Sequence, residues 1–87
     1  MSNWAVGSNV PGYLPTGTVS VTSDADEAKR MLIHELKFCE GYAESEAIAE
    51  EYNAAAEDVN LMSVPLTVVV DGIAYWVAET DEEADEG

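Results

Sequence analysis

The sequence predicts a small α+β domain in which a two-helix hairpin packs on a small antiparallel sheet. Two central segments, 23–41 and 45–59, repeat apolar residues at the helical period, and residues 64–80 contain two β-branched and aromatic runs around a turn sequence. A chain of 87 residues can bury one core. We therefore expect one domain over residues 1–80, with an ordered N-terminal loop, and a flexible acidic tail over residues 81–87.

The N-terminal segment is punctuated by prolines and glycines. Pro11-Gly12 fits the central pair of a type II turn, because proline presets the first φ and glycine accepts a positive φ at the second. The segment also contains too many apolar residues for a free linker. We predict a short strand from Asn3 to Val6, which would add a third strand to the sheet, and an ordered loop across the core for the rest.

The first helix is predicted to begin after Ser23, a suitable N-cap that is followed by acids where the helix dipole favours them, and to end near Gly41. Its apolar face consists of Ala25, Ala28, Leu32, Leu36 and Cys39. The second helix is predicted to start at Ser45 or Glu44 and to end near Val59. Its apolar stripe consists of Ile48, Tyr52, Ala55 and Val59.

Residues 64–80 are predicted to form a β-hairpin, because Asp71-Gly72 lies between two runs of β-branched and aromatic residues. Pro65 cannot donate a hydrogen bond to a neighbouring strand, so it belongs at the start of a strand or on an edge. Tyr75 and Trp76 are adjacent, so their side chains leave opposite faces of the strand. One should pack on the helices, and the other needs the N-terminal segment, a dimer partner or a target.

The charge is strongly unbalanced. There are 18 acids against three bases, which gives a formal net charge of −15. Residues 79–87 hold six of the acids and no base, so the rest of the chain still carries −9. Such a field repels nucleic acid and anionic lipid and attracts basic protein surfaces. The sequence therefore predicts a protein partner, with no direct nucleic-acid binding.

The compartment is predicted from cysteine usage and hydropathy. Cys39 is the single cysteine, so no internal disulfide can form, which fits a reducing compartment. The apolar runs are too short to cross a bilayer, and the N-terminus lacks the basic and apolar pattern of a signal peptide. We expect a cytoplasmic protein without membrane contact.

Three stretches of the chain carry a resemblance: the opening SNWAVGSNVPGYLP, the central AEDVNLMS and the later DGIAYWVAE. Together they resemble small uncharacterised accessory proteins encoded by bacteriophages of actinobacteria, and the similarity covers most of the chain. The resemblance implies expression in the cytoplasm of a bacterial host and action on host or phage machinery. It implies no activity and no catalytic residues.

No arrangement of residues favours catalysis. His34 and Glu35 begin like the helical zinc motif H-E-x-x-H, but Phe38 stands where the second histidine belongs. His34 and Cys39 are five residues apart and point about 140° away from each other on a helix, so they do not form a nucleophile–base pair. Cys39 is expected to be a small buried thiol. We expect no enzymatic activity, no metal and no cofactor.

The acids of the second helix form two rows in projection. At about 100° per residue, Glu46, Glu50 and Glu57 lie opposite the apolar stripe, and a second row flanks it. The second row consists of Glu44, Glu51 and Asp58. Spacing along each row is about 6–10 Å, and phosphates advance about 3.4 Å per nucleotide, so the carboxylates could imitate every second or third phosphate. A solvated amphipathic helix also places its acids outward.

The second half of the chain differs from an ordinary solvated surface because it lacks basic residues. From Gly41 to Gly87 there is no lysine or arginine, whereas solvated helices usually mix both signs. Adaptation to a salty host and a dedicated anionic surface both explain this, and the phage resemblance favours the second. We therefore predict a phage-type protein that binds the basic surface of a host bacterial protein, such as a nucleic-acid-binding one, and inhibits or modulates it as a DNA mimic.

The predicted partner-binding residues are the six acids of the two rows and Trp76. The alternative is a structural or assembly protein that forms a homodimer through its hairpin or helix face, with the charge serving only solubility.

Overall fold

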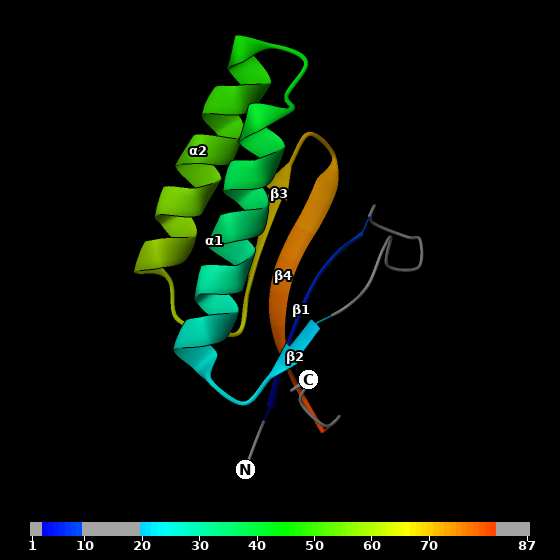
Figure 1. Ribbon diagram of the computed structural model, residues 1–87, viewed down its shortest axis with the longest axis vertical. Helices are drawn as coiled ribbons and strands as arrows, with labels where there is room; N and C mark the ends of the chain where they lie inside the picture. Colours follow the sequence, from blue (N-terminus) through cyan, green and yellow to red (C-terminus); the bar gives the residue numbers. More distant parts are fainter. Residues whose placement is uncertain (1–2, 10–19, 82–87) are drawn as a thin grey trace.

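The computed structural model describes residues 3–9 and 20–81. These residues form four antiparallel strands in the order β2-β1-β4-β3, and two helices, α1 and α2, that pack on one face of this sheet (Figure 1). The predicted α+β class is confirmed. The Pro11-Gly12 turn and the acidic tail beyond Asp81 lie outside the described residues.

The predicted hairpin is formed by β3 (Leu66–Val70) and β4 (Ile73–Thr80). Asp71 and Gly72 both have positive φ, 51° and 76°, as a two-residue type I′ turn requires. This turn twists in the same sense as the strands that it joins, which is why the Asp-Gly pair predicted it well.

The N-terminal part of the sheet is larger than the sequence predicted. β1 runs over Asn3–Asn9, three residues beyond the predicted end at Val6, because its whole length pairs with β4. A further strand that we did not predict, β2 (Ser20–Thr22), pairs with the other side of β1. β2 has only three residues, too few for an alternating pattern to stand out in the sequence.

The helices lie close to their predicted positions. α1 spans Ala25–Gly41, but its N-cap is Asp24 rather than Ser23, because the Asp24 carboxylate accepts the amide hydrogens of Asp26 and Glu27. α2 spans Glu46–Leu61, and the hydroxyl of its N-cap Ser45 accepts the amide hydrogen of Ile48 at 3.2 Å. α2 thus ends two residues beyond the predicted Val59.

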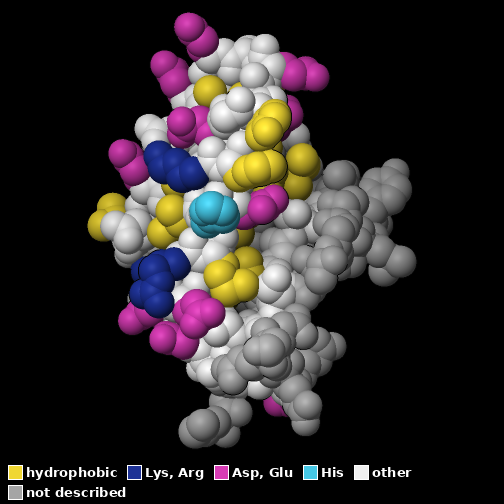
Figure 2. Space-filling model, viewed as in Figure 1, with side chains coloured by type: hydrophobic (Ala, Val, Ile, Leu, Met, Phe, Trp, Pro, Cys, Tyr) yellow, Lys and Arg dark blue, Asp and Glu magenta, His cyan; other side chains and the backbone are white. Residues whose placement is uncertain are grey.

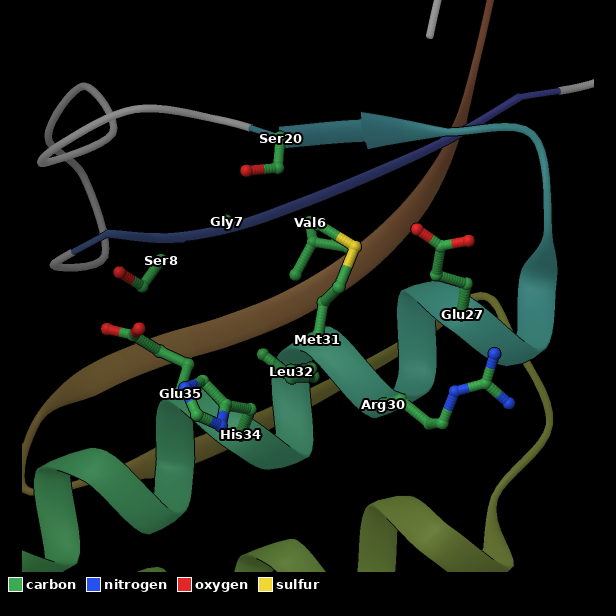
Figure 3. Close-up of a pocket in the computed structure, with 10 residues that line it drawn as sticks. All are labelled: Val6, Gly7, Ser8, Ser20, Glu27, Arg30, Met31, Leu32, His34 and Glu35. Atoms are coloured by element: carbon green, nitrogen blue, oxygen red, sulfur yellow. The ribbon is translucent and has the colours of Figure 1, made fainter. Parts of the chain in front are cut away.

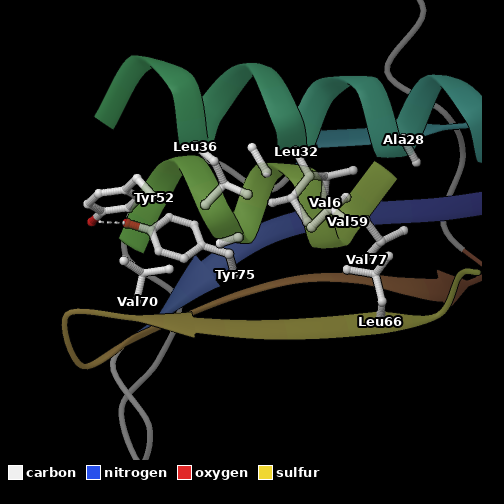
Figure 4. Close-up of a cluster of buried hydrophobic side chains, with 12 residues drawn as sticks. Val6, Ala28, Leu32, Leu36, Tyr52, Val59, Leu66, Val70, Tyr75 and Val77 are labelled. Atoms are coloured by element: carbon white, nitrogen blue, oxygen red, sulfur yellow. Dashed lines mark hydrogen bonds between the residues drawn. The ribbon is translucent and has the colours of Figure 1, made fainter. Parts of the chain in front are cut away.

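The core lies between the helices and the sheet (Figure 4). The helical stripes predicted from the sequence face it, although Ala25, Cys39 and Ile48 are only half-buried. The strands contribute alternate residues, as the pleat of a sheet requires. The strand residues in this core are Val6, Leu66, Val70, Tyr75 and Val77. Because the helices cover one face only, the other face of the described sheet carries no helix.

Candidate interaction surfaces on the second helix and the sheet

The outer surface of α2 carries the acids that the sequence singled out. Glu46, Glu50 and Glu57 are exposed on the side opposite the buried stripe of the helix. Glu51 and Asp58 are exposed as well and flank that stripe. Glu44 is exposed but precedes the N-cap, so it is not part of the helix. The second predicted row is therefore only Glu51 and Asp58 on the helix.

All three bases lie on α1, and the two lysines reach toward α2. The amine of Lys29 donates to the backbone carbonyl of Asn60 at 3.1 Å. The amine of Lys37 donates to the side-chain oxygen of Asn53 and lies 3.6 Å from a carboxylate oxygen of Glu40, a residue of its own helix. Both lysines thus contact amide oxygens of α2. Over residues 3–9 and 20–81, no base forms an ion pair with a carboxylate of α2.

The outer face of α1 is mixed in charge. Arg30, His34 and Lys37 share one side of the helix at the helical period. Figure 2 shows the Lys and Arg side chains on either side of the single histidine, with acidic side chains around them. This is the pattern of an ordinary solvated helix, in which opposite charges alternate.

An open groove lies between α1 and the β1–β2 half of the sheet (Figure 3). Its volume is about 710 Å³, and Met31 points across it from α1 toward Val6. Glu27, Glu35 and two serines add polar groups to its lining. The carboxylate of Glu35 accepts a hydrogen bond from the thiol of Cys39, one turn further along α1, at 4.0 Å.

A small polar cluster lies in the core near the C-terminal end of α1 and the N-terminal half of α2. The hydroxyls of Tyr52 and Tyr75 are 2.8 Å apart (Figure 4). The Tyr75 hydroxyl also donates to the Cys39 sulfur at 3.8 Å. Burial raises the pKa of Tyr75 and, to a smaller extent, that of Tyr52, so both phenols are neutral at pH 7. The cluster ties α1, α2 and β4 together. Cys39 is half-buried rather than fully buried as predicted.

Cys39 and His34 do not meet, as their spacing indicated. His34 lines the groove beside β1 and β2, whereas Cys39 lines a separate shallow pocket near the α1–α2 connection. Within the described ranges, no group of three or more His, Cys, Asp or Glu side chains could hold a metal ion. No described helix is long and apolar enough to cross a membrane.

Trp76 lies on the sheet face that carries no helix, while its neighbour Tyr75 faces the core. Its indole nitrogen donates to the side-chain oxygen of Asn9 at 2.8 Å. The indole ring also covers Gly7, where an added Cβ would lie only 2.7 Å from the ring. Trp76 therefore has internal partners on β1, one of the explanations that the sequence left open. Its predicted contact with a partner protein stays a prediction.

Comparison with protein families, with curated proteins and with solved structures finds no match for the chain. The fold and the distribution of charge on it are therefore the basis for the functional argument.

Proposed function

We propose that the protein binds the basic surface of a host bacterial protein through the outer face of α2, and that it inhibits or modulates this partner by occupying a groove that normally holds nucleic acid. One observation carries the proposal: Lys29 and Lys37 bind amide oxygens of α2 and leave its five helical carboxylates without a base. A solvated surface with no specific partner does not need this segregation of charge.

The spacing of the acids suits a phosphate-binding groove. Glu46, Glu50 and Glu57 are four and seven residues apart, which places them about 6 and 10 Å apart along the helix axis. Phosphates on one strand repeat about every 3.4 Å, so the carboxylates fall near every second and third phosphate position. Lysines and arginines that hold a nucleic-acid backbone could therefore bind these carboxylates instead. The resemblance to phage accessory proteins supports a bacterial host as the source of the partner.

The experiment is an affinity capture from bacterial lysate at low salt, with elution by a salt gradient and then by DNA. A specific partner should be released by rising salt, because charge pairs are screened, and by DNA, because DNA competes for the same groove. The test variant replaces the six predicted acids by their amides: E44Q, E46Q, E50Q, E51Q, E57Q and D58N. It should lose the partner and keep the circular dichroism spectrum of the fold.

A matched control has the same net charge with the α2 face intact. It carries D26N, E27Q, E35Q, E79Q, D81N and E82Q, so both variants change from −15 to −9. The control should retain the partner. If the two variants lose binding equally, only total charge matters and the α2 face is not the site. If the test variant binds as well as the unmodified protein, the phosphate-mimic mechanism is wrong.

A further inference from the structure

β3 forms an edge of the described sheet and carries no charged side chain. Its residues alternate: Leu66 and Val70 are buried toward the helices, while Thr67 and Val69 are exposed on the other face. Val69 is 63% exposed. Edge strands in proteins usually carry lysines, prolines or bulges that prevent pairing with another chain. Pro65 precedes β3, but the strand itself has none of these features.

The backbone of β3 has groups that can receive another strand. In a two-residue hairpin the pair next to the turn, here Val70 and Ile73, is a hydrogen-bonded pair. Because bonded and non-bonded pairs alternate along an antiparallel ladder, Thr67 and Val69 belong to non-bonded pairs with β4. Their N–H and C=O groups therefore point outward from the edge.

The flank of α2 above this edge is acidic. α2 packs over β3, and its Asn53 and Asn60 face α1, as their lysine contacts show. Glu51 and Asp58 lie about 80–100° from the buried stripe on the opposite side of the helix from Asn53 and Asn60. They point away from α1 and over the β3 edge. A strand added to β3 would thus run alongside two carboxylates that form no ion pair with a base in the described structure.

The charge decides what can occupy this edge. A second copy that paired β3 with β3 would bring its own α2 next to the first, with Glu51 and Asp58 of both copies close together. At a net charge of −15 per chain, that arrangement is repelled. A basic segment meets the opposite condition, because its side chains would pair with these carboxylates.

We propose that the β3 edge binds an extended segment of a partner protein in which basic residues alternate with β-branched or apolar ones. Residues paired opposite Leu66, Val68 and Val70 would project toward α2, where Lys or Arg meets Glu51 and Asp58. Residues opposite Thr67 and Val69 would project to the helix-free face, where Val or Ile covers Val69. Main-chain hydrogen bonds supply the pairing, and the alternation supplies the selectivity.

This inference deepens the proposed function, since it specifies how part of a basic partner would dock, but the two rest on different residues. The outer row Glu46, Glu50 and Glu57 serves the proposed groove binding alone, and the outward backbone of Thr67 and Val69 serves strand addition alone.

The test uses the full chain and a short fluorescent peptide, capped at both ends, in which lysines alternate with valines and threonines. Its binding is measured by fluorescence anisotropy. Two control peptides have the same composition: one groups the lysines into a block, and the other keeps the alternation but carries N-methyl groups on the amides that would pair with β3. We expect the affinity of both controls to be lower by a factor of about ten or more. The block peptide loses the alternation, and the N-methylated peptide loses the hydrogen bonds to β3.

Variants of the protein complete the test. V69P removes an outward N–H that takes no part in the β3–β4 ladder, and edge strands tolerate proline, so the fold should survive while the peptide affinity drops about tenfold. Should V69P unfold, V69K serves instead, since it places a lysine on the edge, where it blocks the apolar contact and repels the peptide. E51Q/D58N should weaken binding about three- to tenfold, and E46Q/E50Q/E57Q should change it little.

Each outcome separates the two proposals. Equal binding of the N-methylated and unmodified peptides would overturn strand addition and leave the groove-binding proposal standing. Loss of the lysate partner by E46Q/E50Q/E57Q with normal peptide binding would support both. Self-association of the chain that V69K abolishes would show that the edge takes a second copy, and would overturn the basic-segment proposal.

Discussion

α1 and α2 are nearly equal in length and each buries one side against the sheet, yet they differ on both their inner and their outer sides. On the inner side, α1 contributes the large aliphatic residues Leu32 and Leu36, whereas α2 contributes alanines with Val59 and Tyr52. On the outer side, α1 mixes both charge signs and α2 carries acids only. The difference indicates a division of roles: α1 anchors the fold, and α2 presents a charged surface.

The largest expected effect tests the anchoring role. L36A should lower the free energy of unfolding by about 2–5 kcal/mol, because Leu36 is fully buried and its loss leaves a cavity. A56G, at a nearly fully buried position of α2, should cost only about 1 kcal/mol, mostly in helix propensity. Urea unfolding followed by circular dichroism measures both. An equal loss of unfolding free energy in the two variants would contradict the proposed division of roles between α1 and α2.

The next test concerns the polar contact of α2 with the sheet. The pKa values of Tyr52 and Tyr75 are raised above 10.0 in the folded protein, so the fold keeps protons that the unfolded chain releases above that pH. The stability they contribute is fully present below pH 10 and should fall above it by up to about 1.4 kcal/mol per pH unit for each tyrosine. Unfolding curves measured from pH 8 to about pH 11.5 check this slope.

Y52F serves as the control for that titration, because it leaves one buried phenol of the pair. Its slope above pH 10 should be smaller than the original, because only Tyr75 still releases its proton more readily in the unfolded chain. A stability that stays constant up to pH 11.5 in the unmodified protein would refute the burial-induced shift of both phenols.

A smaller effect tests the bond between the helices. K29M removes the amine that donates to the last turn of α2, where the helix dipole favours a positive charge. It should cost about 0.3–1 kcal/mol, most clearly at low salt. R30M removes a base from the outer face of α1, and we expect a smaller loss there. Chemical denaturation at two salt concentrations distinguishes the two variants, and an equal loss would show that Lys29 acts only through net charge.

The smallest effect tests the charge segregation itself. E46Q/E50Q/E57Q should stabilise the protein slightly at low salt, because Glu46 and Glu50 are four residues apart on the helix, and like charges at this spacing destabilise it by about 0.2–0.5 kcal/mol per pair. The matched variant D26N/E27Q/E35Q on α1 should gain less, since bases lie among those acids. Thermal melts at low and high salt measure the gain. A larger gain in stability for the α1 variant than for the α2 variant would show that like charges are more crowded on α1.

Much of the fold could be predicted from the sequence because the signals are local. The apolar stripes of both helices and the Asp71-Gly72 turn depend on neighbours within a few residues. The N-cap of α1 was misplaced by one residue, because Ser23 and Asp24 are both good caps and only the geometry chooses between them. β2 was missed because three residues give no period.

The exposure of the α2 acids could be predicted, but their isolation from the lysines could not. Lys29 reaches Asn60 across 31 positions, and Trp76 reaches Asn9 across 67, distances at which sequence spacing carries no geometric information. The contact of Trp76 with Gly7 had one sequence signal, a glycine in the middle of an otherwise ordinary strand. The sequence predicted that the N-terminal segment adds a third strand, but it did not indicate that this strand pairs with β4.

That pairing has a consequence for how the protein is made. Asn3 lies opposite Thr80, so the contact that completes the sheet joins residues 77 positions apart. Closing so long a loop is slow relative to forming helices. During synthesis, β1 emerges before β4, and among the described strands it has only the three-residue β2 to pair with until β4 has left the ribosome. The two helices can form before then, but the described sheet beneath them is complete only when β4 is available to pair with β1.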